Sequence, residues 1–218
     1  KLTSGSLHAC LFAEALYLHD DGENIFCIET ACLGKKINLD KNKLNNVVKD
    51  YIDFQEYLAK SGDHSMRSTM ELAMETVTKL GLDKKDQRKL LEYVVELSSA
   101  EVSLPRIIQH GDLTPDNLLL SERGLCIIDY DYVGNSDIPG FDLFGLFHRF
   151  GQTNLLKLCE EYFPVYFEKI GGKFSGGNYR NLMFIYHLIE HTQGKLNDYV
   201  DISPRQIILD FESLYPQS

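Results

Sequence analysis

The sequence predicts an α+β fold in which a mostly helical body carries a small β insert and follows a β-hairpin. Three segments between residues 43 and 99 repeat apolar residues at three- and four-residue spacing, which is typical of amphipathic helices. Short apolar runs broken by polar turns lie before and after them, and these runs are too short for helices. At 218 residues, 44% of them apolar, the chain can bury a core as one domain, or as one domain with a small appendage.

The elements are expected in a definite order. Residues 6–17 and 24–30 should form strands, and the polar segment 19–23 is suited to the turn of a hairpin. A connector at 31–36 follows, with Gly34 as its flexible point. The remaining elements are helices at 43–60, 65–80 and 84–99, small strands at 106–109, 117–120 and 125–130, and further helices beyond residue 140.

Two helix boundaries carry explicit signals. Gly81 is suited to end the second long helix, and Asp83 is suited to cap the start of the third. The glycine-rich segment 171–177 contains a lysine but lacks the G-K-[ST] ending of a phosphate-binding loop. We therefore expect an interhelical turn there.

Composition excludes several classes of protein. The net charge of -10 argues against a general nucleic-acid binder, which needs basic surface to neutralise phosphates. No apolar run approaches the length of a membrane span. The first residue is Lys1, which indicates a fragment or a processed product. The cysteines are scattered and lack C-x-x-C spacing, which indicates buried free thiols in a reducing compartment and a cytoplasmic protein: Cys10, Cys27, Cys32, Cys126 and Cys159.

Acidic residues gather in one part of the chain. Between residues 110 and 142 there are seven acids and one base, Arg123. Such a cluster is costly unless cations relieve the repulsion, so it predicts metal ions, a cationic substrate, or both. The alternative is a solvated acidic loop. The acids are Asp112, Asp116, Glu122, Asp129, Asp131, Asp137 and Asp142.

Within this cluster lies an arrangement that phosphoryl transfer requires. Asp112, in the sequence HGD, precedes Asn117 by five residues, and an apolar run then ends at Asp129. A carboxylate such as Asp112 can orient a hydroxyl and accept its proton. Asn117 and Asp129 can hold magnesium on the phosphates of a nucleotide.

The segments HGDLTPDN, IIDYD and PGFDLFG resemble, in order and spacing, the catalytic and metal-binding loops of the aminoglycoside phosphotransferase/choline kinase family. The resemblance implies a protein-kinase-like fold with a helical large lobe. It also implies transfer of the γ-phosphoryl group of ATP to a hydroxyl of a small molecule, with Mg²⁺ as cofactor.

The same resemblance assigns roles to individual residues. Asp112 would be the catalytic base, and Asn117 and Asp129 would bind the metal. Asp131, two residues further on in a segment expected to be extended, would point to the same side as Asp129 and would join the metal site or face the substrate. Structural support would come from two further residues, His110 and Asp142, which would bind the loop backbone and tie a helix start to it. For each acid the alternative is a surface loop carboxylate.

The hairpin resembles the last strand of the small lobe and the hinge that follows it. In this family the hinge backbone pairs with adenine, which would here involve the Glu29 carbonyl, the Ala31 amide and Cys32. Leu119 and Ile128 would form an apolar floor beneath the base.

The N-terminal part departs from the family pattern. No G-x-G-x-x-G is present, and Lys1 is the only lysine before Lys35, so the phosphate-binding lysine of the small lobe has no counterpart. We therefore divide the chain into a remnant of the small lobe with the hinge, 1–34, and a large lobe, 35–218. Either the chain is part of a larger polypeptide or it is a reduced form of the fold. The alternative function is a non-catalytic binding or scaffolding module of a larger polypeptide.

The acceptor implied is a small molecule such as an aminoglycoside, an amino alcohol or a sugar, and the acidic residues favour a cationic one. A protein acceptor is disfavoured because HGD replaces the H-R-D of protein kinases. The sequence His187 to His191 matches the H-x-x-E-H zinc pattern, but few residues follow it to complete a zinc hydrolase. We prefer a helix that lines the acceptor pocket.

Overall fold

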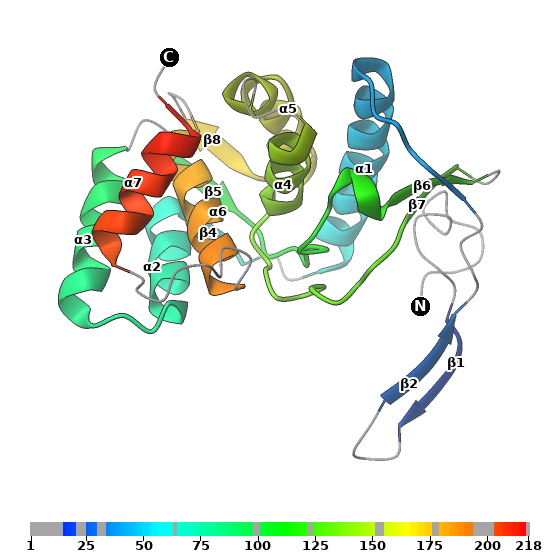
Figure 1. Cartoon of the computed structure of the whole chain (residues 1–218), viewed down its shortest axis with the longest axis horizontal. Coiled ribbons are helices and arrows are strands. Elements are labelled where there is room, and N and C mark those ends of the chain that lie inside the picture. Colours follow the sequence, from blue (N-terminus) through cyan, green and yellow to red (C-terminus); the bar gives the residue numbers. More distant parts are fainter. Residues whose placement is uncertain are drawn as a thin grey trace.

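The computed structural model describes residues 15–20, 25–29, 34–62, 65–97, 101–121, 124–150, 155–175, 179–193 and 203–216. Figure 1 shows the helices gathered in one body, with a two-stranded hairpin at the N-terminal side. No helix in these ranges is long and apolar enough to cross a membrane.

The expected hairpin is present, but its turn is shorter than predicted. Strand β1 (Ala15–Asp20) pairs antiparallel with β2 (Ile25–Glu29), and the pairing continues to Asp20 opposite Ile25. His19 and Asp20, which we expected in the turn, therefore belong to β1 because both have partners across the ladder. Residues 6–14 and 30–33 lie outside the described residues.

The three long helices are confirmed, with one boundary corrected. They are α1 (Lys41–Ser61), α2 (Thr69–Lys79) and α3 (Lys84–Glu96). α2 begins later than expected because Ser68 and Glu71 form a capping box that fixes its start. Asp83 caps α3 by accepting from the Asp86 amide, and Gly81, with φ 69°, follows the end of α2 as predicted.

Besides the hairpin, the described residues form two small antiparallel sheets. One has the order β3 (Lys35–Lys36), β6 (Leu118–Ser121) and β7 (Gly124–Ile127), which confirms two of the expected strands. The other has the order β4 (Arg67–Ser68), β5 (Glu101–Leu104) and β8 (Lys173–Ser175).

One strand prediction and one turn prediction were wrong. The expected strand at 106–109 is displaced to β5, because 107–109 bond instead to the loop at 134–137: the Ile107 amide donates to the Asp137 carbonyl over 3.1 Å. The glycine-rich segment 171–177, expected to be a turn, contains β8, because Phe174 pairs with Val102 of β5.

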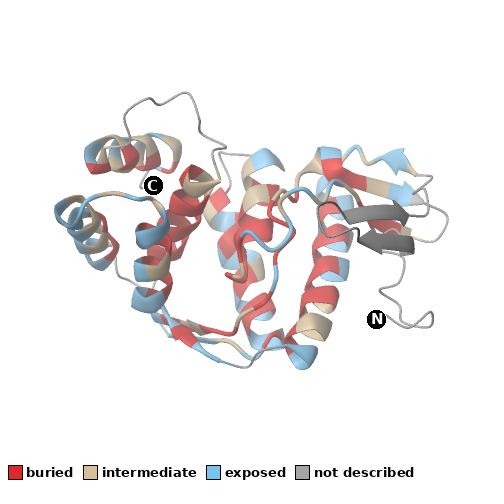
Figure 2. Ribbon diagram, turned by 90° about the horizontal axis from the view of Figure 1, so that it is seen from below, coloured by how far each residue is buried: buried red, intermediate tan, exposed pale blue. Residues whose placement is uncertain are grey.

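In the described part of the chain the later helices are α4 (Phe141–Phe150), α5 (Leu155–Lys169), α6 (Arg180–Thr192) and α7 (Pro204–Leu214). α6 is the central one, since it contacts α2, α3, α4 and α7 and every residue from Arg180 to Ile189 is buried. Figure 2 shows the buried residues running through the middle of the body, with exposed residues on the outer faces of the helices. This core includes buried residues of both α4 and α6, which contact each other.

The cysteines only partly follow expectation. Cys159 is a buried free thiol, and burial raises its pKa. Cys126, however, is disulfide-bonded. The prediction of free thiols is therefore wrong for Cys126, because spacing in the sequence does not show which sulfur atoms the fold brings together.

Candidate active site

The loop that carries the HGD motif connects β5 to the short 3₁₀ helix η2 (Pro115–Asn117). The side chain of Asp142 binds the backbone of this loop. The Oδ2 atom of Asp142 accepts from the His110 amide at 2.6 Å, and its Oδ1 atom accepts from the Gly111 amide at 2.8 Å. Asp142 lies in the first turn of α4. One buried carboxylate thus joins the helix start to the backbone just before Asp112.

Gly111 is required by the path of this loop. Its φ is 87°, and a Cβ placed on it would lie 2.5 Å from the backbone oxygen of Tyr132. Both the left-handed backbone and the close approach favour glycine. This contact explains the glycine of the HGD motif.

His110 joins the catalytic loop to the segment that precedes Asp129. Its Nδ1 accepts from the Asp112 amide over 3.4 Å, and its Nε2 lies 3.1 Å from the Ile128 carbonyl. Because a carbonyl only accepts, Nε2 carries the proton and Nδ1 is the acceptor. The Ile128 amide in turn donates to the Asn117 carbonyl over 3.0 Å, so the two loops form one unit.

Asn117 is positioned directly against Asp112. Its Nδ2 donates to the Asp112 carbonyl at 2.9 Å and to the Asp112 Oδ2 at 3.1 Å. The amide nitrogen therefore faces the carboxylate, and the amide oxygen is the atom that Asn117 can offer to a cation. A hard oxygen of this kind suits Mg²⁺.

Asp129 follows Ile128 in the left-handed region, with φ 65°, and it is exposed. Aspartate adopts this region more readily than most residues. A turn over 131–134 follows, in which the Val133 amide donates to the Tyr130 carbonyl. The segment is not extended, so our reason for placing Asp131 on the same side as Asp129 was wrong. The role of Asp131 in metal or substrate binding stays a prediction.

Within the described residues, no group of three or more His, Cys, Asp or Glu side chains forms a preformed metal site. Magnesium differs from zinc in this respect, because it is commonly bound by one or two carboxylates together with water and substrate phosphates. The donor set of Asn117 and Asp129 fits such an ion.

Behind Asp142 lies a buried network of polar side chains that the sequence analysis missed. Tyr51 donates to Asp142, and Gln55 donates to the Tyr51 hydroxyl at 3.0 Å. The Oε1 atom of Gln55 accepts from Gln109 at 2.8 Å and from the Tyr166 hydroxyl at 3.0 Å. The i, i+4 spacing of Tyr51 and Gln55 on α1 was the available signal, but nothing in it pointed to the catalytic loop.

The network sets the electrostatics of Asp142. Burial raises the pKa of this carboxyl, although the hydrogen bonds from Tyr51 and the loop amides act in the opposite direction. Burial and the neighbouring Asp142 also raise the pKa of Tyr51 well above its ordinary value. Tyr51 therefore stays protonated and donates to the carboxyl group.

The acidic cluster does not act as one unit. Asp137 lies 2.9 Å from the Arg67 guanidinium and 2.7 Å from that of Arg106, and although burial opposes them, these arginines lower its pKa. Asp116 pairs with Lys36 at 3.0 Å on the surface. The expectation that the cluster serves bound cations is therefore wrong for these two acids, which have basic side chains as partners.

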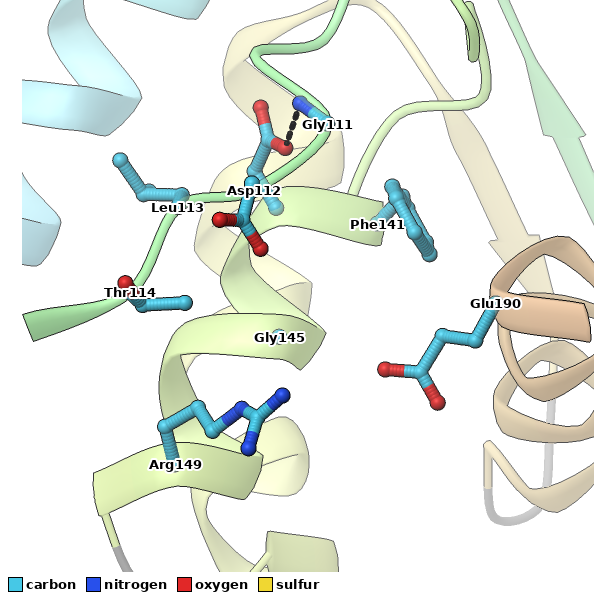
Figure 3. A pocket seen from close by; sticks show the side chains of 9 residues that line it. Gly111, Asp112, Leu113, Thr114, Phe141, Gly145, Arg149 and Glu190 are labelled. Carbon is cyan, nitrogen blue, oxygen red and sulfur yellow. Dashed lines mark hydrogen bonds between the residues drawn. The ribbon is translucent and has the colours of Figure 1, made fainter. Parts of the chain in front are cut away.

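Asp112 opens onto a pocket between the catalytic loop, α4 and α6 (Figure 3). α6, the helix that we expected to line an acceptor pocket, contributes Glu190 to this pocket, and its use by an acceptor stays a prediction. Arg149, from the last turn of α4, was not foreseen. The lining residues are Gly111, Asp112, Leu113, Thr114, Phe141, Asp142, Gly145, Arg149 and Glu190.

The two histidines of the H-x-x-E-H pattern do not line this pocket. His187 is fully buried and His191 is 9% exposed, and their Nε2 atoms lie 3.3 Å apart. Burial lowers the pKa of His187 to about 3, and the neighbouring His191 adds to the effect. Within the described residues no third His, Cys, Asp or Glu joins them in a metal-binding group.

The residues expected to bind the nucleotide are only partly described. Leu119 and Ile128 are half-buried, and Lys36 of β3 pairs with Leu119 of β6. Gly34 lies so close that a Cβ on it would be 2.8 Å from the Leu119 Cβ. The described end of the connector therefore packs on β6, the strand that carries Leu119, one of the two residues expected to lie beneath the nucleotide base. Glu29 ends β2 but its side chain is not described, and Ala31 and Cys32 lie outside the described residues.

A protein family and a solved structure are similar to this chain. The family model described as the phosphotransferase enzyme family matches residues 55–172, a span that contains Asp112, Asn117, Asp129 and Asp142. No curated protein matches the chain. Among solved structures it is similar to a choline/ethanolamine kinase family protein from Mesorhizobium loti, with 15% sequence identity and a TM-score of 0.46. That similarity covers 95% of this chain and 75% of the other. The expected α+β class is confirmed, because the described residues form helices together with small antiparallel sheets.

Proposed function

Because this chain belongs to the phosphotransferase enzyme family, we propose that it transfers the γ-phosphoryl group of ATP to a hydroxyl of a small molecule, with Mg²⁺. The observation that carries the proposal is the unit formed by Asp112, Asn117 and His110. In it, a carboxylate at the rim of a pocket is bonded to an amide whose oxygen suits a metal. We also propose that residues 1–34 are a remnant of the small lobe with the hinge and that residues 35–218 are the large lobe.

Asp112 would receive the acceptor hydroxyl and take its proton. The transition state of phosphoryl transfer is loose, so aiming the hydroxyl matters more than strong base chemistry. The bonds from Asn117 to the carboxylate and from the Asp112 amide to His110 fix the carboxylate in direction. Its side chain also lines the pocket, which gives the acceptor a place to lie.

Asn117 and Asp129 would hold magnesium between them and the phosphates of the nucleotide. When bound, the ion would neutralise charge on the phosphates of ATP. The Ile128 to Asn117 backbone bond keeps the two loops that carry these ligands together. The acceptor would be an aminoglycoside, an amino alcohol or a sugar, as expected for a small-molecule kinase.

The test is ADP release from ATP with and without magnesium, over a panel of hydroxyl acceptors, with the products identified by mass spectrometry. Asp112→Asn removes the base, and its loss of kcat should be about 10² to 10⁴-fold. Asp116→Asn is the matched control, because Asp116 lies in η2, directly after the loop, but on the surface. An Asp112→Asn variant as active as the Asp116→Asn control would contradict the proposal.

A further inference from the structure

Residues 134–137, here called the exit segment, lie between Asp129 and α4 and run beside the residues that lead into the catalytic loop. Backbone hydrogen bonds hold the two stretches together. They run from the Ile107 amide to the Asp137 carbonyl over 3.1 Å, from the Gln109 amide to the Ser136 carbonyl over 3.0 Å, and from the Gly134 amide to the Gln109 carbonyl over 3.1 Å. The stretch that follows Asp129 is therefore fixed to the stretch that precedes Asp112.

A ring of ion pairs, here called the charged ring, holds the end of the exit segment. It consists of Arg67, Glu75, Arg106 and Asp137. The Oδ1 atom of Asp137 lies 2.9 Å from Arg67, and its Oδ2 atom lies 2.7 Å from Arg106. Glu75 of α2 closes the ring, at 2.7 Å from Arg67 and 3.1 Å from Arg106. Arg67 also donates to the Asp137 carbonyl at 2.8 Å, so it binds the backbone of the exit segment as well as the side chain.

Burial limits the freedom of the charged ring. The side chain of Arg67 is only 5% exposed, and the other side chains of the ring are partly exposed. A buried guanidinium is costly without carboxylate partners, so Arg67 is held where Asp137 and Glu75 lie. Desolvation offsets much of the attraction in such pairs, but the planar guanidinium donates only in fixed directions. The ring is therefore suited to fix the position of the exit segment.

The direction of the Asp129 side chain depends on what holds the backbone on either side of it. Before it, the Ile128 amide donates to the Asn117 carbonyl, and the His110 ring donates to the Ile128 carbonyl. Asp129 itself is exposed and has a φ of 65°, so the path of the backbone decides where its carboxylate points. After it, the turn over 131–134 leads directly into the exit segment. The exit segment is thus the fixed point on the far side of Asp129.

We infer, on the basis of the proposed function, that Asp137 and its partners Arg67 and Arg106 are positioning residues for Asp129. Through the charged ring they fix the backbone that follows Asp129, and in this way they set the affinity of the site for magnesium on the nucleotide. Groups that bind a metal ligand directly commonly change metal affinity about tenfold or more when they are removed. The charged ring acts through the backbone, so we expect an effect of about fivefold.

The experiment measures how the binding of a non-hydrolysable ATP analogue depends on magnesium, which requires no turnover. Calorimetric titrations at a series of Mg²⁺ concentrations give the concentration at which binding is half-maximal, here called the magnesium requirement. They are made at a temperature at which circular dichroism shows every variant to be folded. In Asp137→Asn the magnesium requirement should rise about fivefold or more relative to the parent chain. Arg106→Gln, which leaves the bonds from Arg67 in place, should raise it about threefold.

Two control variants separate positioning from a general loss of stability. Glu75→Gln removes a carboxylate from the same ring, but Glu75 lies on α2 and not in the exit segment. Asp53→Asn removes a partner of Lys169 in a partly exposed ion pair between α1 and α5, which carry no proposed metal ligand. Both variants should keep the magnesium requirement within about twofold of the parent value. Urea unfolding of every variant records how much stability each change removes.

The outcomes separate the inference from the function on which it rests. A folded Asp137→Asn variant with the magnesium requirement of the parent would overturn the inference and leave the proposed function intact. Equal rises in Asp137→Asn and Asp53→Asn would also overturn it, because lower stability alone would then explain them. If Asp137→Asn does not fold, Arg106→Gln decides, and a parental magnesium requirement in that variant would refute the inference. A parent chain that neither binds the analogue with magnesium nor releases ADP from ATP would overturn the proposed function together with the inference.

Discussion

The two sides of the catalytic loop are built differently. Behind the loop, Asp142, Tyr51 and Gln109 are buried and bonded to one another or to the loop backbone. In front of it, Asp112 is half-buried at a pocket and Asp129 is exposed. The same type of side chain thus occurs in two settings: a buried carboxylate fixes the backbone, and accessible carboxylates are the ones that we propose to bind ligands. This contrast predicts that changes behind the loop act on stability and changes in front act on chemistry.

The largest effect is expected from Asp142→Ala. It would leave the amides of His110 and Gly111 and the Tyr51 hydroxyl without their acceptor in a buried region. Unfolding in urea should show a loss of about 3 to 5 kcal/mol, since each unpaired buried donor costs roughly 1 to 3 kcal/mol. An Asp142→Ala variant that is as stable as the parent would contradict the view that the buried side of the loop stabilises the fold.

Gly111→Ala should be the next most damaging change. The left-handed backbone and the contact with the Tyr132 oxygen would together cost about 2 to 4 kcal/mol in the free energy of unfolding. Gly134→Ala is the matched control, because Gly134 has φ 82° but nothing within 4 Å of an added Cβ. It should cost only about 1 kcal/mol, so equal losses would show that the close contact at Gly111 has no energetic weight.

A pH titration contrasts the network with a second buried polar group, His187. Burial lowers the pKa of His187 to about 3. Since the unfolded chain binds this proton near pH 6.5, stability is fully present above that pH and is lost as the pH falls toward 3. Between pH 6.5 and pH 5 the loss should be about 2 kcal/mol, at about 1.4 kcal/mol per pH unit. In a His187→Gln variant the loss of stability between pH 6.5 and pH 5 should be smaller by that amount. An unchanged loss would show that His187 does not cause it.

The smallest effect is expected in front of the loop, from Gly145→Ala. Alanine is better than glycine inside a helix, and the added Cβ meets only the Leu113 oxygen at 3.9 Å. The free energy of unfolding should therefore rise by about 0.5 to 1 kcal/mol. The same methyl group enters the pocket, so KM for the acceptor should rise. A variant that gains stability without any change in KM would show that the acceptor does not lie on this face of α4.

The sequence shows the local motifs of the candidate site, whereas the catalytic and metal-binding roles of their residues stay predictions. Asp112, Asn117 and Asp129 stand at fixed spacing in short local motifs, and such motifs can be recognised without knowing the tertiary structure. Three long amphipathic helices and the capping aspartate of α3 were also predictable, because helical periodicity and capping are local properties.

What could not be predicted depends on contacts between distant elements. Tyr51 on α1 reaches Asp142 on α4, and Glu190 on α6 faces the pocket beside Arg149 on α4. None of these pairs has a signal in the sequence, since only the packing of the helices brings them together. The extended conformation assumed for Asp131 failed for a related reason, because the left-handed Asp129 and the turn after it redirect the chain.

The proposed function requires that the front of the loop bind magnesium and a nucleotide. Calorimetric titration of a non-hydrolysable ATP analogue, with and without Mg²⁺, into the chain and into Asp129→Asn tests it most directly. Asp116→Asn serves as the surface control. We predict magnesium-dependent binding that is retained by the control and is lost, or weakened about tenfold or more, in Asp129→Asn. Binding that needs no magnesium, or that is the same in Asp129→Asn as in the parent chain, would contradict the claim.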